Sequence, residues 1–110
     1  MQSVSLTSLV DELHAKAGDA ASGRAAVTVH GGHEHDLRQT VIVLLEGRAL
    51  GEHSSPGEAT LQVLRGRVRL EAGGRSWEGG AGDHLVIPPE RHDLAALEDA
   101  AVLLTVATRA

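Results

Sequence analysis

The sequence predicts an all-β domain, a small antiparallel sandwich or barrel, preceded by a short N-terminal α-helix. One helical stripe of apolar residues lies near the N-terminus, and the rest of the chain consists of short strand-like runs separated by turn residues. Glycine makes up 13 of the 110 residues, about 12% against an average of about 7%, which indicates many tight turns. We expect residues 1–24 to form the helix and a linker, and residues 25–110 to form the β domain.

The helix is predicted over residues 5–17. Its apolar residues share one stripe: Leu6, Leu9, Val10, Leu13 and Ala17. Ser5 or Thr7 can cap the start of this helix, and Gly18 is a natural stop. Because the stripe is too apolar for the surface of a small monomer, we expect it to cover either this chain's own barrel or that of a neighbour.

Eight or nine short strands are predicted after the helix, with residues 49–53 as one of them. Their ranges are 25–30, 37–45, 49–53, 59–65, 67–72, 75–78, 84–87, 92–97 and 101–107. Turn residues separate them at 31–32, 46–47, 54–57, 66, 73–74, 79–82 and 88–89. Apolar and charged residues alternate from Arg67 to Ala72, so one face of that strand is apolar and the other charged. Many short strands without an intervening helix indicate an antiparallel sandwich or barrel.

The composition excludes several classes of function. Cysteine is absent, so disulfides, thiolate metal sites and cysteine nucleophiles are excluded. The net charge is −5, so the chain lacks the basic patch of a nucleic-acid binder. The sequence contains one tryptophan, Trp77, and no phenylalanine or tyrosine, so it also lacks a platform on which bases could stack. The longest apolar runs are far shorter than the ~18–20 residues of a membrane span, and no signal peptide is visible. We expect a cytoplasmic protein with no nucleic-acid and no membrane partner.

Residues 47–66 resemble the first motif of the cupin family, in which glycines flank a His-x-His pair and a glutamate at fixed spacing. In the segment GRALGEHSSPGEATLQVLRG, Gly47, His53 and Gly66 are in register with that motif. The resemblance extends over roughly two thirds of the chain, residues 37–107. It implies that the predicted barrel is a small cupin-like jelly roll.

A second segment, GDHLVIPPERH at 82–92, resembles the other cupin motif. Gly82 and Pro88 match this motif, whereas Glu90 occupies the position of a glycine and His92 lies one residue before the position of the motif histidine. Both motifs occur in the order typical of the family, and both lie in the part of the chain that is predicted to form strands. Together they identify the family more specifically than either motif would alone.

The cupin motifs supply four metal ligands from neighbouring strands, and the resemblance assigns two of them here, His53 and His92. The other two positions carry Ser55 and Ala59. A barrel directs alternate side chains inward, so we expect both histidines on one side of its interior. They either hold a divalent ion (zinc, nickel, iron or manganese) weakly, with water completing the shell, or line a pocket and bond a ligand or each other. Glu58 would need a β-bulge to turn inward.

The other five histidines lie outside these assignments. His30, His33 and His35 are interpreted as a solvated loop; the alternatives are adventitious binding of zinc or nickel, or a contribution to a site in a partner subunit. His84 is expected to be a partly exposed strand residue, and His14 is expected on the surface of the helix. Trp77 is most simply a packing residue of a hairpin, and the arginines at 65, 67 and 69 a solvated face.

The leading hypothesis is a binding module whose interior holds a small molecule, with the two motif histidines as polar anchors. Leu61, Val63 and Val68 are expected to line that interior. The alternative is a metal-dependent enzyme of the dioxygenase, isomerase or decarboxylase type, because a two-histidine metal leaves positions open for oxygen or a bidentate substrate. A third class is a non-catalytic interaction protein that works through its negative surface and sheet edge. Small barrels of this family often pair through sheet edges, so we expect a homodimer.

Overall fold

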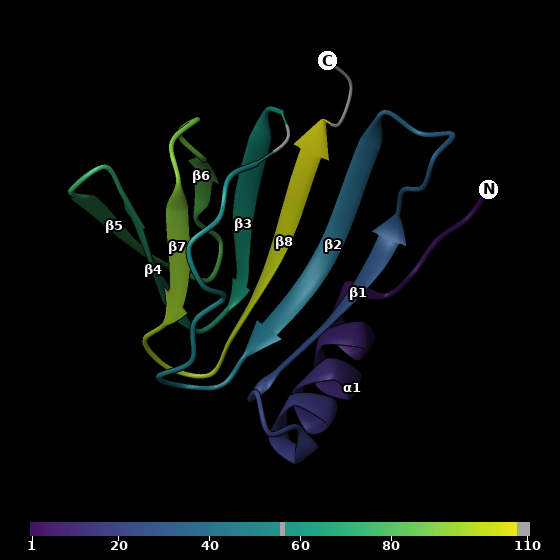
Figure 1. Cartoon of the computed structure of the whole chain (residues 1–110). Helices are drawn as coiled ribbons and strands as arrows, with labels where there is room; N and C mark the ends of the chain where they lie inside the picture. The colour runs from purple at the N-terminus through teal and green to yellow at the C-terminus, as the bar shows by residue number, and fades with distance from the viewer. Residues whose placement is uncertain (56, 108–110) are drawn as a thin grey trace.

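A computed structural model describes residues 1–55 and 57–107 of the chain. This part of the chain contains α1 (Leu6–Asp19), β1 (Arg24–His30), β2 (Leu37–Leu44), β3 (Ala59–Arg65), β4 (Arg67–Ala72), β5 (Arg75–Gly80), β6 (His84–Val86), β7 (His92–Ala96) and β8 (Ala100–Ala107). Two antiparallel sheets, β1-β2-β8-β3-β6 and β5-β4-β7, face each other (Figure 1). The predicted all-β class with a leading helix is confirmed. Pro56 of the predicted turn 54–57 and the last three residues of the predicted domain 25–110 lie outside the described residues.

The core lies between the two sheets because alternate residues of each strand point to the same face. Ile42 of β2, Val102 of β8 and Val63 of β3 share the inner face of the larger sheet through their pairing. They are buried in one apolar cluster with Leu61 of β3 and Val68 of β4. The prediction that Leu61, Val63 and Val68 line the interior is therefore confirmed.

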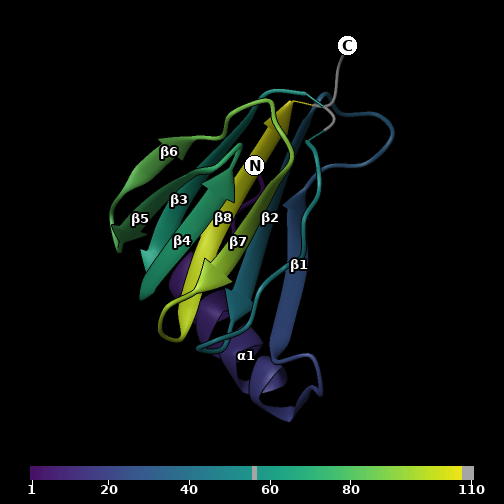
Figure 2. The ribbon, with the colours of Figure 1, turned by 60° about the vertical axis from the view of Figure 1, so that its left-hand side comes forward.

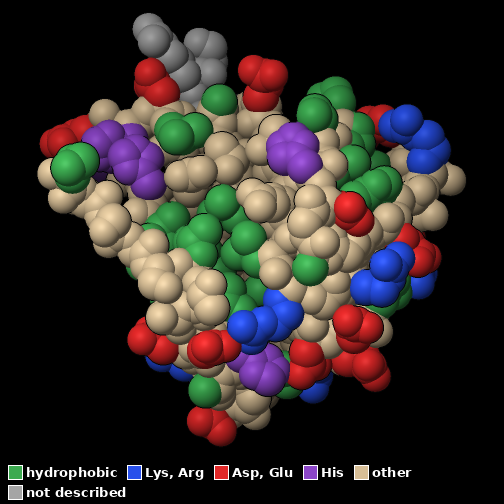
Figure 3. Space-filling model, turned by 180° about the vertical axis from the view of Figure 1, so that it is seen from behind, with side chains coloured by type: hydrophobic (Ala, Val, Ile, Leu, Met, Phe, Trp, Pro, Cys, Tyr) green, Lys and Arg blue, Asp and Glu red, His purple; other side chains and the backbone are tan. Residues whose placement is uncertain are grey.

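The helix packs on the outer face of the five-stranded sheet. Val10 and Leu13 are buried there against Val41 and Val43 of β2 and Ala101 of β8. Seen from behind in Figure 3, hydrophobic side chains gather in the middle of this face and charged side chains along its lower rim. The apolar stripe thus covers this chain's own sheet, which was one of the two expectations. None of the helices in the described residues is long and apolar enough to cross a membrane.

The helix begins as predicted and ends later. Oγ of Ser5 accepts the backbone N–H of Ser8 at 3.2 Å, so Ser5 is the cap. Gly18, predicted as the stop, lies inside the last turn, and the helix continues to Asp19. It ends because Ala20 adopts an extended backbone with φ −90° and ψ 138°. The prediction of the stop is wrong since Gly18 keeps a helical conformation.

The segment 49–53, predicted as a strand, runs alongside β7 but does not form a continuous ladder of backbone hydrogen bonds with it. Isolated bridges join it to β7, one of them between His53 and His92. The backbone of Gly51 has a φ of 94°, which interrupts the extended conformation. Oδ1 of Asp93 accepts the N–H of Gly51 at 2.9 Å and holds this irregular turn in place. The prediction of a strand is therefore wrong here, although the segment does run beside β7.

Asp99, between β7 and β8, connects the helix to the sheet. Its Oδ2 lies 2.8 Å from Nε2 of His14, and its Oδ1 accepts the backbone N–H of Glu46 at 2.8 Å. The contact with His14, followed by the hydrogen bond from Glu46, holds the pKa of the Asp99 carboxyl below its usual value. The ionised form of Asp99 therefore stabilises the folded chain.

We expect Asp99→Ala to lower the free energy of unfolding by about 1 kcal/mol at neutral pH, the usual contribution of an exposed pair and a backbone hydrogen bond. Because the pKa is lower in the folded state, this stabilisation is present above the unfolded pKa of about 3.9 and is lost as the pH falls through the folded pKa. Urea unfolding of both proteins between neutral pH and about pH 3 measures the difference. A difference that does not shrink toward low pH would contradict a role for the Asp99 charge.

Candidate functional site

The two histidines that the motifs assign lie side by side. His53 is in the segment after β2, and His92 is the first residue of β7. The backbone N–H of each donates to the carbonyl oxygen of the other at 2.9 Å. The centres of the two imidazole rings are 4.5 Å apart, and the ring planes meet at 64°. The expectation that the motifs bring these two side chains together is confirmed.

Hydrogen bonds to the backbone fix the tautomer of both rings. Nδ1 of His53 lies 2.8 Å from the carbonyl oxygen of Gly51, and Nδ1 of His92 lies 2.9 Å from that of Glu90. A carbonyl oxygen only accepts, so each Nδ1 carries the hydrogen. In the neutral ring, Nε2 is then the nitrogen with a lone pair, which can bind a metal ion or accept a hydrogen bond.

The cavity beside the histidine pair is small and apolar. His92 is 2% exposed, and His53 is half-buried. The cavity has a volume of about 10 Å³, close to the ~10–15 Å³ that one water molecule requires. Aliphatic side chains complete its lining: Ile42, Leu50, Leu61, Leu70, Ile87, Leu94 and Leu104. The interior therefore has room for one water molecule or ion, and an organic ligand needs space elsewhere.

The positions of the two missing motif ligands stay without a metal-binding side chain. Ala59 is buried and has no donor atom. Ser55 is half-buried, and Glu58 is exposed rather than turned inward. Within residues 1–55 and 57–107, no group of three or more His, Cys, Asp or Glu side chains is arranged to hold an ion. A metal bound to the pair would take its other ligands from water or from a bound molecule.

The remaining histidines lie apart from this pair. The rings of His30 and His35 have centres 4.6 Å apart, and both residues are exposed, as is His33. This agrees with a solvated loop at His33 and His35, whereas His30 is the last residue of β1. His84 is exposed on β6, and His14 makes the contact between helix and sheet described above. A metal or partner role for the loop histidines stays a prediction.

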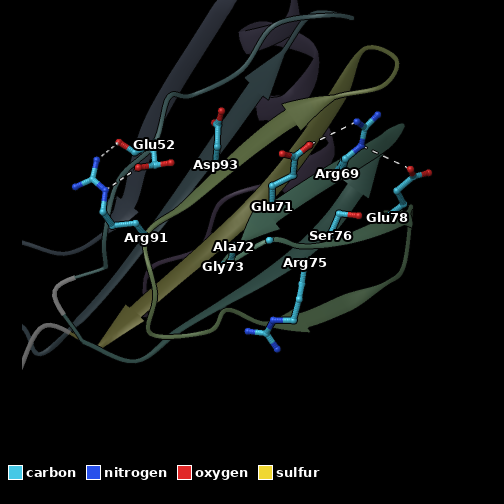
Figure 4. A pocket seen from close by; sticks show the side chains of 11 residues that line it. Glu52, Arg69, Glu71, Ala72, Gly73, Arg75, Ser76, Glu78, Arg91 and Asp93 are labelled. Carbon is cyan, nitrogen blue, oxygen red and sulfur yellow. Dashed lines mark hydrogen bonds and ion pairs between the residues drawn. The ribbon is translucent and has the colours of Figure 1, made fainter.

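A polar hollow of about 650 Å³ lies on the outer face of the three-stranded sheet (Figure 4). Arg69 of β4 lies 3.6 Å from the carboxylates of Glu71 and Glu78. At the other side of the hollow, Nε of Arg91 donates to Glu52 at 2.8 Å. Arg69 and Arg91 are thus paired with carboxylates of the same face, as expected of a solvated charged surface.

Comparisons with known proteins agree with this architecture. The family model of the cupin domain matches residues 40–108. A conserved protein of unknown function from Streptococcus pyogenes is 28% identical, with a TM-score of 0.73 over 83% of this chain and 79% of its own. An RmlC-like cupin protein from Desulfovibrio desulfuricans is 26% identical, with a TM-score of 0.67 over 77% of this chain and 82% of its own. A cupin superfamily protein from Desulfitobacterium hafniense shares the fold at 13% identity, with a TM-score of 0.72 over 78% of each chain. The search of curated proteins found no match.

Proposed function

This chain belongs to the cupin domain family, and we propose that it is a binding module whose working site is the pair His53 and His92. In this proposal the pair holds a divalent metal ion weakly, and the ion and the two rings anchor a small molecule. The observation that carries the proposal is the hydrogen bonding of the rings. Each Nδ1 donates to a backbone carbonyl, which orients the ring and makes Nε2 the ligand atom, as in most metal-binding histidines.

The spacing of the two rings supports this proposal. With metal–nitrogen bonds of about 2.0–2.1 Å, two imidazoles on one ion have ring centres about 4.5 Å apart at octahedral corners and about 5 Å apart at tetrahedral corners, and the distance here is 4.5 Å. Imidazole suits zinc, nickel and iron better than manganese, which prefers oxygen ligands. Two protein ligands favour weak binding and leave positions open. A bound ion would supply positive charge that polarises an oxygen atom of the small molecule.

We expect His53→Ala to abolish stoichiometric zinc binding because one remaining imidazole cannot hold the ion alone. The measurement is calorimetric titration of zinc into the untagged chain after its metal has been removed with a chelator. The wild type should bind one zinc ion per chain, and His53→Ala should bind at least about tenfold more weakly. Thermal unfolding of each variant establishes that it is folded.

Two controls assign the zinc to the pair. His84→Ala removes an exposed strand histidine and should leave the titration unchanged. A variant with His30, His33 and His35 all replaced by Ala removes the histidine loop and should also retain the zinc. If the loop variant loses the zinc while His53→Ala keeps it, the proposed site is refuted.

Several sequence-based expectations stay predictions. The alternative enzyme of the dioxygenase, isomerase or decarboxylase type would use the same pair of histidines. The cytoplasmic location also stays a prediction. The homodimer loses the support of the helix stripe, which the chain's own sheet covers. It is still favoured by the edge strand β1, where Val27 is 37% exposed.

A further inference from the structure

An apolar pocket opens between the two sheets, where their edge strands β5 and β6 lie near each other. Figure 2 shows these strands as neighbouring edges of the barrel. The pocket has a volume of about 310 Å³, within the ~300–1,000 Å³ typical of small-molecule sites. Its apolar walls are Leu70, Ala72, Trp77, Leu85, Val86 and Pro88. This flank pocket has the space that the cavity beside the histidines lacks.

Trp77 forms a fixed wall of the flank pocket. It lies on the inner face of β5, opposite Leu70 of β4. A Cβ atom on Gly79 would come within 2.2 Å of the Trp77 ring, so the indole occupies the space that a side chain at position 79 would need. At the rim, Val86 is 68% exposed, a large apolar side chain that a ligand would cover. Trp77 thus does more than pack a hairpin, because it also lines a pocket.

The charged group at the rim of the flank pocket is Arg75, which forms an ion pair with Glu90. In Figure 4 the Arg75 side chain points away from the paired charges of the polar hollow. The Arg75 side chain is 69% exposed and that of Glu90 is 44% exposed, so water screens the pair and a ligand can replace Glu90 at little cost. A guanidinium recognises a carboxylate through two parallel hydrogen bonds. The rim therefore suits an anionic end and the walls an apolar body.

We propose that the flank pocket binds a small carboxylate, with its apolar body against Trp77 and its carboxylate on Arg75. Leu70 lines both this pocket and the cavity beside His53 and His92, so this side chain separates such a ligand from the histidine pair. This inference goes beyond the proposed function, because the flank pocket is a second site whose ligand is held by Trp77 and Arg75 and not by the histidine pair. It requires no metal ion, and its test is independent of zinc.

The first experiment titrates octanoate, and separately the neutral octan-1-ol, into the metal-free chain. Trp77 is the one tryptophan of the sequence, so its indole N–H signal in a ¹H–¹⁵N spectrum needs no further assignment. Octanoate should shift this signal and the amide signals of Arg75, Leu85 and Val86 saturably. Octan-1-ol should shift them with lower affinity. The absence of a saturable shift at these residues with octanoate would overturn the proposal.

Two variants of the ion pair should change octanoate affinity in opposite directions. Arg75→Gln removes the carboxylate partner and should weaken binding about two- to fivefold, the usual range for an exposed pair. Glu90→Gln releases Arg75 and should strengthen binding by a similar factor. Both effects should decrease at high salt and be absent with octan-1-ol. Arg67→Gln, an exposed arginine outside the pocket, is the matched control and should change nothing.

The outcomes separate this inference from the metal proposal. His53→Ala should lose zinc and keep octanoate binding, because the flank pocket does not include His53. Octanoate binding without zinc binding would contradict the proposed metal site and support the flank pocket. Zinc binding without octanoate binding would support the metal site and contradict the proposed role of the flank pocket. If Arg75→Gln and Glu90→Gln leave octanoate affinity equal to that of the wild type, the carboxylate assignment is wrong.

Discussion

Gly66→Ala is expected to destabilise the fold by about 2–5 kcal/mol. Gly66 forms the turn between β3 and β4 with a φ of 77°, a left-handed backbone that costs an L-residue about 1–2 kcal/mol. A Cβ atom at this position would also lie 2.1 Å from the carbonyl oxygen of Asp99. The Asp99 oxygen is a backbone atom that cannot rotate away, so the turn at Gly66 and the segment before β8 must move apart, at a further cost of about 1–3 kcal/mol. This glycine closes the first cupin motif, and the close approach explains why a glycine is needed there.

Gly47→Ala is the matched control for that prediction. Gly47 opens the same motif with a φ of 81°, but a Cβ atom there meets nothing within 4 Å. Its replacement should therefore cost only the strain of the left-handed backbone, about 1–2 kcal/mol. Urea unfolding of the two variants measures the difference. Equal losses of stability would show that the approach of Asp99 to Gly66 does not constrain the fold.

Leu61→Ala is expected to lower the free energy of unfolding by about 2–5 kcal/mol, as for other leucines buried in cores. Leu61 is 2% exposed and lies between Leu104 of β8 and Leu85 of β6 in the larger sheet. It also lines the cavity beside the histidine pair, so its loss should enlarge that cavity. Since a domain of this kind is stable by only about 5–15 kcal/mol, this variant should unfold at a clearly lower temperature.

Gln62→Ala, one residue further along β3, is the control for Leu61. Gln62 is exposed because consecutive side chains of a strand point to opposite faces. Its replacement should change the free energy of unfolding by less than about 0.5 kcal/mol. A loss in Gln62→Ala as large as that in Leu61→Ala would mean that the register of β3 is wrong.

Much of the fold was predictable because it follows from local patterns. The alternation from Arg67 to Ala72 assigned the two faces of β4, and the apolar stripe assigned the buried face of α1. The predictions were wrong at two glycines, where the backbone conformation of a single residue determines whether a strand or a helix continues. Gly51 interrupts a segment that reads as a strand, and Gly18 keeps a helical backbone where a stop was expected. Composition alone does not distinguish a glycine that turns the chain from one that does not.

The candidate site was predictable only in part. Motif spacing predicted that His53 and His92 lie together, and in the structure an isolated bridge joins the segment of His53 to β7. The flank pocket was not predicted, because it depends on how two separate sheets meet at β5 and β6. One signal was present: Glu90 replaces the glycine of the second motif, and it is this residue that pairs with Arg75. The size of the interior cavity depends on packing and has no signature in the sequence.

In the proposed site, Nε2 of His53 and Nε2 of His92 are the ligand atoms that bind the same ion. Long-range ¹H–¹⁵N correlation spectra of the histidine rings test it directly, because they report the tautomer of each ring and its response to zinc. We expect both rings in the Nδ1–H tautomer in the metal-free protein above neutral pH, and shifts of both Nε2 signals on addition of zinc. An Nε2–H tautomer in either ring, or zinc-dependent shifts confined to His30, His33 and His35, would contradict the proposed site.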